Sequence, residues 1–362
     1  MLSLWTAALL LTAGCHSSSM KTEPGTNEPL EISDFVGNAA CASCHSAEYH
    51  AHHGSRHDTT FHKADIASLG SLAPSLGVIP LAGYGLTEQS GQLMMSRSVP
   101  TQLSQPLDYV LGSGKFGMTF VTLISADSLQ ESHMSFFPGR RSWEMTPGQE
   151  EPMPGDQVFG RADSPAASRR CIGCHTTTLG AKDLHPDPKF FGVGCESCHG
   201  PGRKHIEALK SGDLKAAQMD KLGAWKSTQL NALCGKCHRD TKDVDITNAT
   251  AMQQTHRFQP YALNRSACRM ATGEPLSCLQ CHTPHSNASV DAKGYEAVCL
   301  SCHESGKTHN ASHHVDSKGK PCPVNPASGC IGCHMRPMRA FPKTFIEGAM
   351  VDHLISIPPK AP

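Results

Sequence analysis

The sequence predicts a mainly α-helical protein with low regular secondary structure and one small antiparallel β insertion near residues 105–150. Three observations predict this fold. Only 38% of the 362 residues are apolar and 6% are aromatic, which is little material for a large core. A short cysteine and histidine pattern recurs at intervals that leave room for only one or two helices. Residues 105–150 differ, because they combine Gly turns with β-branched and aromatic runs.

The charge balance excludes one class of partner. The chain has 32 Lys and Arg against 32 Asp and Glu, so its formal net charge is zero. Nucleic-acid-binding proteins are usually basic, and we therefore expect no nucleic-acid partner. The unusual counts are 17 Cys and 22 His. About 5% cysteine is below the level of small disulfide scaffolds, so the cysteines need another explanation.

Fourteen of the 17 cysteines belong to seven copies of the pattern Cys-x-x-Cys-His. This is the attachment motif of c-type haem, in which two thiols form thioethers and the adjoining His binds the iron as proximal ligand. The sequence therefore predicts seven haem c groups. Motifs 1 to 7, in chain order, consist of Cys41, Cys44 and His45; Cys171, Cys174 and His175; Cys195, Cys198 and His199; Cys234, Cys237 and His238; Cys278, Cys281 and His282; Cys299, Cys302 and His303; and Cys330, Cys333 and His334.

Zinc is the alternative occupant of such cysteine pairs. Zinc ribbons also use Cys-x-x-Cys units, but they need no His directly after the second Cys. Every Cys-x-x-Cys unit in this chain is followed by His. The pattern therefore favours covalent haem.

The spacing of the motifs predicts how the chain is organised. Motif 1 stands 130 residues before motif 2, whereas the later intervals are 21 to 44 residues. Such short segments would pack against porphyrin rather than against a conventional core. We therefore expect short helices around a chain of haems, with haem holding the fold together.

The N-terminal residues predict export from the cytoplasm. Residues 2–11 are an apolar run too short to span a membrane, followed by LTAGC, which ends at Cys15. This is typical of a lipoprotein signal peptide with Cys15 as the lipidated residue, and the alternative is an ordinary cleaved signal. Residues 16–34 would then be a flexible tether and residues 35–362 the seven-haem domain. We expect a lipid-anchored protein of the periplasm, the outer membrane or the cell surface.

Two cysteines outside the motifs and the lipidation site remain, Cys268 and Cys322. In an oxidising compartment an even remainder suggests a disulfide. Two buried thiols are the alternative.

The histidine count allows a second histidine at every iron. Fifteen histidines lie outside the motifs, and seven low-spin haems need seven distal ligands. Bis-histidine ligation would favour low potentials and close each iron to substrates.

Several phrases of the sequence resemble one family. They are CASCHSAEYHAHHGSRH at 41–57, YVLGSGKFGMTF at 109–120, GVGCESCHGPGRKH at 192–205, RFQPYALNRSAC at 257–268, LSCLQCHTPH at 276–285 and CPVNPASGCIGCHMRP at 322–337. In these the chain resembles the bacterial multihaem c-type cytochromes related to hydroxylamine oxidoreductase, its tetrahaem acceptor cytochrome and ammonia-forming pentahaem nitrite reductase. Some relatives carry Cys-x-x-Cys-Lys at a catalytic haem, and this chain has no such motif.

The resemblance implies a set of distal iron ligands and favours the Cys268–Cys322 bridge. His57, His205, His285 and His353 match family phrases. Three further candidates are His256, His313 and His133, the last of which lies in the β insertion. His309 and His314 compete with His313 for its role.

Three functional hypotheses follow. The first is an electron-transfer protein, not an enzyme, which would exchange electrons with redox protein donors and acceptors. The second is a haem enzyme that reduces or oxidises a small nitrogen or sulfur compound at one five-coordinate haem. The third is a filament or scaffold protomer, with haem contacts between protomers. A high-spin ferric signal that responds to nitrite or hydroxylamine would distinguish the enzyme.

Overall fold

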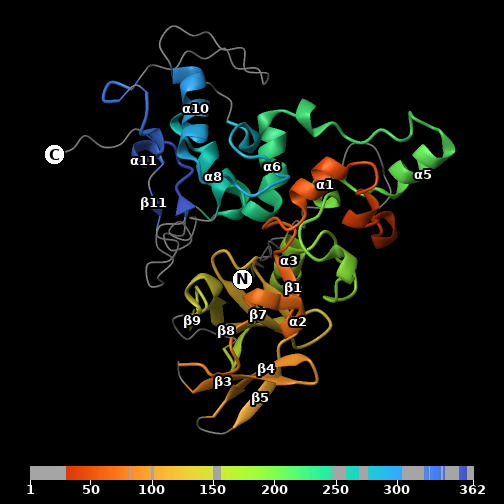
Figure 1. Ribbon diagram of the computed structural model, residues 1–362, viewed down its shortest axis with the longest axis vertical. Helices are drawn as coiled ribbons and strands as arrows, with labels where there is room; N and C mark the ends of the chain where they lie inside the picture. The colour runs from red at the N-terminus through yellow and green to blue at the C-terminus, as the bar shows by residue number, and fades with distance from the viewer. Residues whose placement is uncertain are drawn as a thin grey trace, which may run out of the picture. The chain divides into compact units, whose positions relative to one another are not determined.

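The structure, a computed structural model, describes residues 30–80, 83–98, 102–149, 156–245, 247, 258–268, 276–303, 322–325, 327–335, 337–338 and 350–356 (Figure 1). All elements given below belong to one structural unit that begins at Ile32. The α-helices are α1 (Ser46–His52), α2 (Ile66–Leu69), α3 (Pro165–His175), α4 (Glu196–His199), α5 (Arg203–Ser211), α6 (Ser227–His238), α8 (Gln259–Asn264), α10 (Ala292–His303) and α11 (Cys330–His334). The 3-10 helices are η1 (Ile32–Asp34), η2 (Asn38–Ala40), η3 (Gly70–Leu72), η4 (Pro138–Arg140), η5 (Pro188–Phe190), η6 (Leu222–Ala224), η7 (Thr241–Asp243) and η9 (Cys278–Gln280).

A six-stranded antiparallel sheet forms the larger β layer. Its main path runs β1-β6-β7-β8-β10, and β9 pairs with β8. The longest strand, β8, is buried along nearly its whole length, as expected for a strand that is covered on both faces. The strands are β1 (Phe61–Lys63), β6 (Tyr109–Leu111), β7 (Met118–Leu123), β8 (Leu129–Phe137), β9 (Ser142–Met145) and β10 (Gly160–Ala162).

A four-stranded antiparallel sheet in the order β2-β3-β4-β5 forms the smaller layer. Its strands are β2 (Gly77–Val78), β3 (Tyr84–Gln89), β4 (Gln92–Arg97) and β5 (Leu103–Pro106). Ser90 and Gly91 join β3 to β4 with φ of 51° and 86°. Positive φ at both positions matches the type I′ hairpin turn, which suits the twist of the flanking strands. A separate pair, β11 (Pro337–Met338) and β12 (Met350–Val351), lies near the C-terminus.

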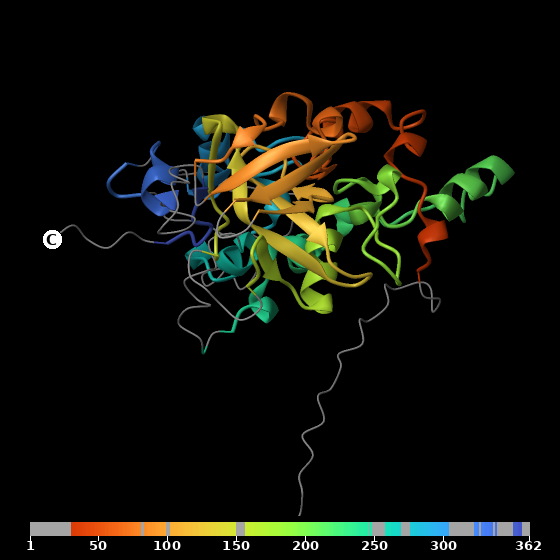
Figure 2. The same ribbon diagram turned by 90° about the horizontal axis from the view of Figure 1, so that it is seen from below.

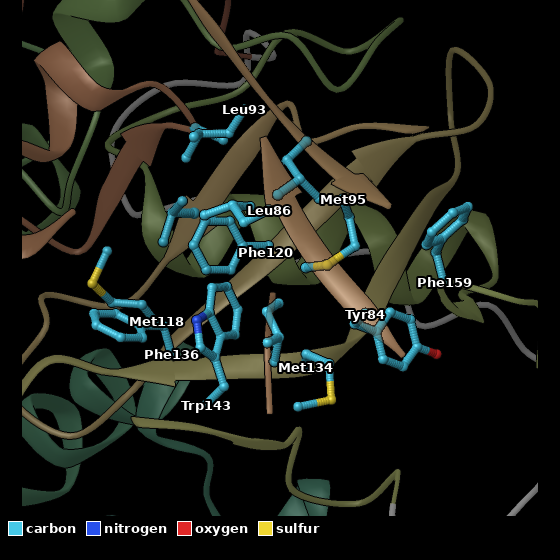
Figure 3. Packing of buried hydrophobic residues seen from close by; sticks show 14 of the residues in the cluster. Tyr84, Leu86, Leu93, Met95, Met118, Phe120, Met134, Phe136, Trp143 and Phe159 are labelled. Atoms are coloured by element: carbon cyan, nitrogen blue, oxygen red, sulfur yellow. The ribbon is translucent and has the colours of Figure 1, made fainter. Parts of the chain in front are cut away.

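The two sheets share one apolar core (Figure 3). Leu86, Leu93 and Met95 of the small sheet pack with Phe120 and other residues of the large sheet, and these side chains are fully buried. Phe120 also stacks on Trp143, with ring centroids 5.3 Å apart. In Figure 2, which shows the structure from below, the orange strands of the small sheet lie in front of the yellow strands of the large one.

The expectation of a mainly α-helical fold with low regular structure is wrong. The described residues include two antiparallel sheets of six and four strands. Strands do occur within residues 105–150, but the β region extends from Phe61 to Ala162. The expectation failed because it used the average aromatic content of the whole chain. The β region alone contains enough aromatic residues to build a core.

The helical segments carry most of the motifs. The motif histidine is the last residue of α3, α4, α6, α10 and α11. Ser164 caps α3 by accepting the N–H of Ala167, and Pro165 at the first position favours helix initiation. Neighbouring helices pack in pairs, α6 with α8 and α10 with α11, and Figure 1 shows these four close together.

Candidate haem-binding site

Four pairs of imidazole rings lie at nearly equal separations. Each pair joins one motif histidine to one histidine outside the motifs, from a segment distant in the sequence. The ring centroids are 6.4 Å apart for His45 and His205, 6.1 Å for His57 and His238, 6.1 Å for His199 and His285, and 6.2 Å for His282 and His353. The structure therefore brings four of the seven distal candidates to four motifs.

These separations fit an iron between the two rings. A histidine nitrogen binds a metal at roughly 2.0–2.1 Å. The nitrogen lies roughly 1.1 Å from the centre of its ring, since the bonds of the ring are about 1.33 Å long. Two imidazoles on opposite sides of one metal are thus about 6.2 Å apart from centroid to centroid. The observed range of 6.1–6.4 Å agrees with this value.

Hydrogen bonds orient several of these rings. Nδ1 of His205 lies 2.6 Å from the carbonyl oxygen of Ala217, and Nδ1 of His353 lies 3.1 Å from that of Val351. Nδ1 of His334 likewise lies 2.8 Å from the carbonyl oxygen of Ser356. A carbonyl only accepts, so Nδ1 must carry the proton and Nε2 keeps its lone pair. Such an outer hydrogen bond is usual for metal-binding histidines.

Burial also favours the neutral imidazole. Desolvation lowers the pKa of His57, and the nearby His238 lowers it further. Burial also lowers the pKa of His199 and of His353. The neighbouring histidine lowers each further, His285 for His199 and His282 for His353. A neutral imidazole is the form that binds metals, so the donor set has the chemistry that haem iron requires.

Attachment cysteines of different motifs interact with each other. In four pairs, a cysteine of one motif shifts the pKa of a cysteine of another: Cys41 and Cys195, Cys174 and Cys237, Cys234 and Cys278, and Cys299 and Cys330. Besides burial, Cys234 likewise raises the pKa of Cys198, and Cys281 raises the pKa of Cys299, through their negative charge. The attachment sites therefore form one connected series: motifs 1, 3, 4, 5, 6 and 7 follow each other, and motif 2 lies beside motif 4.

Motif 2 is packed against carboxyl groups of the large sheet. Asp163 Oδ2 lies 4.0 Å from the Cys171 Sγ. Burial, followed by the charge of Asp163, raises the pKa of Cys171 to about 12. Burial likewise raises the pKa of Glu131, on β8, to about 7, although Gln149 Nε2 donates a hydrogen bond to its Oε2 at 2.7 Å.

A polar network that sequence reasoning missed connects motifs 1 and 3. Glu196, inside motif 3, is 4% exposed and accepts hydrogen bonds from the backbone N–H groups of Val36, Gly37 and Gly202. Asn38 Oδ1 accepts the N–H of Cys195 at 2.9 Å. A signal was available, because the residue after the first cysteine is apolar or Gly in the other six motifs and charged only here.

The other predicted residues stand as follows. His133 lies on β8 with Nε2 2.9 Å from the Gln157 carbonyl oxygen, and no ring pair among the described residues includes it. Cys268 and Cys322 are both partly buried, and their disulfide stays a prediction. Cys15, His256 and His313 lie outside the described residues. None of the described helices is long and apolar enough to span a membrane.

Comparison with known proteins agrees with the motifs. A family model described as cytochrome c554 and c-prime matches residues 141–200, and a model of the doubled CXXCH motif matches residues 270–308. The multiheme cytochrome MtrA of Shewanella baltica is 24% identical over an alignment of 203 residues, which covers 44% of this chain and 60% of that protein. Cytochrome c-554 of Nitrosomonas europaea is 34% identical over 79 residues, 19% of this chain and 34% of that protein.

One solved structure, the outer cell wall cytochrome OcwA, has a similar fold. Its TM-score is 0.52 at 16% identity, with 89% of this chain and 80% of that chain covered. The haem-attachment motifs, the paired imidazoles and these matches support a multihaem c-type cytochrome. It spans 60% and 34% of the lengths of the two curated relatives.

Proposed function

We propose that this chain is a seven-haem electron-transfer protein that works outside the cytoplasm with redox protein partners. The observation that carries the proposal is the set of four imidazole pairs at 6.1–6.4 Å. A haem held by such a pair supplies a one-electron iron couple. With both imidazoles of a pair holding the iron, no position would be left for a substrate, so these four centres would suit electron transfer rather than catalysis.

The proposed order of the centres follows the attachment cysteines. Cysteines of different motifs lie close enough to shift each other's pKa, which supports neighbouring haem sites. We propose that His45 and His205, His238 and His57, His199 and His285, and His282 and His353 are the proximal and distal ligands of four haems. His133, His256 and His313 are the proposed ligands of the other three centres.

The surroundings of each ligand tune the centre. Carbonyl acceptors at Nδ1 make the ring a stronger donor at Nε2, and stronger donation stabilises the oxidised iron. Each bound haem adds two propionates, so the loaded protein is more acidic than its sequence pI of 7.3.

The location and covalent links complete the proposal. Lipidation at Cys15, with residues 16–34 as a tether, would anchor the protein at the periplasmic face of a membrane, the outer membrane or the cell surface. A Cys268–Cys322 disulfide would link the last motifs. Replacing Cys15 by Ser should release the protein from the membrane fraction, and thiol labelling of the unfolded, unreduced protein should leave Cys268 and Cys322 unlabelled.

Haem counting with electron paramagnetic resonance tests the function. We expect a pyridine haemochrome assay to return seven haems per chain and the ferric protein to show low-spin signals. A high-spin signal that shifts on addition of nitrite or hydroxylamine would instead favour the haem enzyme. Zinc in place of iron on elemental analysis would contradict both.

A further inference from the structure

Glu196 is a buried carboxylate with an unusual set of partners. Its Oε2 accepts the N–H of Gly37 at 2.7 Å, and its Oε1 accepts the N–H of Gly202 at 2.7 Å. The N–H of Val36 lies 3.0 Å from Oε1 and 3.1 Å from Oε2. No Lys or Arg among the described residues forms an ion pair with it. A buried charge is stable only when its oxygens are well hydrogen-bonded, and here backbone N–H groups do this.

The partners of Glu196 belong to the two segments that carry His45 and His205. Gly37 directly precedes η2, which leads into motif 1 at Cys41. Gly202 is the N-cap residue of α5, the helix on which His205 lies. Glu196 itself belongs to motif 3, so one side chain bonds both segments that meet around motif 1.

The two glycines that bond the carboxylate would be strained or crowded by a side chain. A Cβ atom at Gly202 would lie 3.2 Å from Glu196 Oε1, and Gly37 has a φ of +85°. The N–H of Cys195 is also fixed by Asn38, two residues upstream of Ala40. These hydrogen bonds join the segment before motif 1, motif 3 and the start of α5. In this arrangement the His45 and His205 rings are 6.4 Å apart.

We propose that Glu196 is a positioning residue that holds His205 opposite His45, so that a side chain of motif 3 controls iron ligation at motif 1. This inference rests on the proposed haem ligation. The negative charge matters as well as the shape, because hydrogen bonds to an ionised acceptor are roughly twice as strong as those between neutral groups.

The test compares Glu196→Gln with a matched control, Glu207→Gln. Both changes remove one negative charge, but Glu207 lies on α5 near His205 with a side chain that is 64% exposed. In Glu196→Gln the amide offers one acceptor oxygen in place of two, and its NH₂ group faces a backbone donor. We expect all seven haems to be retained, one low-spin signal to become high-spin, and added imidazole to restore it. Glu207→Gln should match the unmodified protein.

The variant His205→Ala assigns the affected centre. It should produce the same new high-spin signal, and adding Glu196→Gln to it should produce no further loss of low-spin signal. Glu196→Asp retains the charge and should show a smaller fraction of the same change, which covers the case in which Glu196→Gln folds poorly. A low-spin spectrum unchanged by Glu196→Gln, or a change at a different centre, would overturn the inference. Absence of low-spin signals from the unmodified protein would instead overturn the proposed function.

Discussion

His199 and His285 come from segments 86 positions apart in the sequence, yet their ring centroids lie 6.1 Å apart with the planes inclined by 16°. His199 belongs to motif 3, whereas His285 follows motif 5. The same cross-segment relationship recurs in the other three pairs. Motif histidines thus meet partners supplied by other parts of the chain, and these partners can be removed one at a time.

Replacing His285 by Ala should open one iron without releasing its haem. The thioethers to Cys195 and Cys198 would remain, so the haem count should stay at seven. One low-spin signal should become high-spin in electron paramagnetic resonance, and added imidazole should reverse the change. His50→Ala is the control, because His50 is exposed on α1 and belongs to none of the four pairs. Identical spectra for His285→Ala and the unmodified protein would refute this ligand assignment.

Replacing Cys195 and Cys198 together by Ala should remove one haem. The expected pyridine haemochrome ratio is six haems per chain, because both thioether sulfurs of motif 3 are lost. Ser197→Ala, a change between the same two cysteines, should leave all seven haems in place. A double variant that retained seven covalent haems would show that motif 3 is not an attachment site.

Replacing Phe120 by Ala should destabilise the β region. Phe120 is fully buried in the core between the sheets, and removing a large aromatic side chain leaves a cavity. Such changes typically cost about 3–5 kcal/mol of unfolding free energy. Denaturant unfolding followed by far-ultraviolet circular dichroism measures the effect. Val78→Ala is the control, since Val78 is 87% exposed on β2, and it should change stability little. Equal stability of the two variants would argue against this core.

Glu131 should make the stability of the β region depend on pH. Burial raises its folded-state pKa from 4.5 to about 7, so the folded protein binds this proton more tightly than the unfolded chain. The contribution is complete below about pH 4.5 and is lost as the pH rises to about 7. The loss is on the order of 3 kcal/mol, at about 1.4 kcal/mol per pKa unit.

The comparison that isolates this group is Glu131→Gln against Glu88→Gln. Glu88 is exposed on β3 and should behave as the unmodified protein does. We expect the unfolding temperature of the β region in Glu131→Gln to be nearly the same at pH 5 and pH 8. The pH dependence that remains in Glu88→Gln is the reference for this comparison. A pH dependence as steep as that of the control would exclude Glu131 as its source.

The sequence was informative where chemistry restricts the residue type. Thioether formation needs two cysteines and the iron needs the adjoining histidine, so the seven motifs could be located directly. His57, His205, His285 and His353 could be named only through family phrases, because their motif partners are set by three-dimensional packing. Composition averaged over the chain concealed the core around Phe120, and with it the two sheets. The charge of Glu196 inside motif 3 was the one sign of its role in the sequence, and its backbone partners leave no pattern there.

The wide separation of paired imidazoles has a consequence for biogenesis. His205 follows His45 by 160 positions, and His285 follows His199 by 86. If the chain is exported amino end first, as proposed, motif 1 would receive its haem before His205 has emerged. Such an early haem would keep one face of its iron open to oxidants and small ligands until the later histidine arrives. Export speed and haem supply would then have to be matched for the finished protein to accumulate.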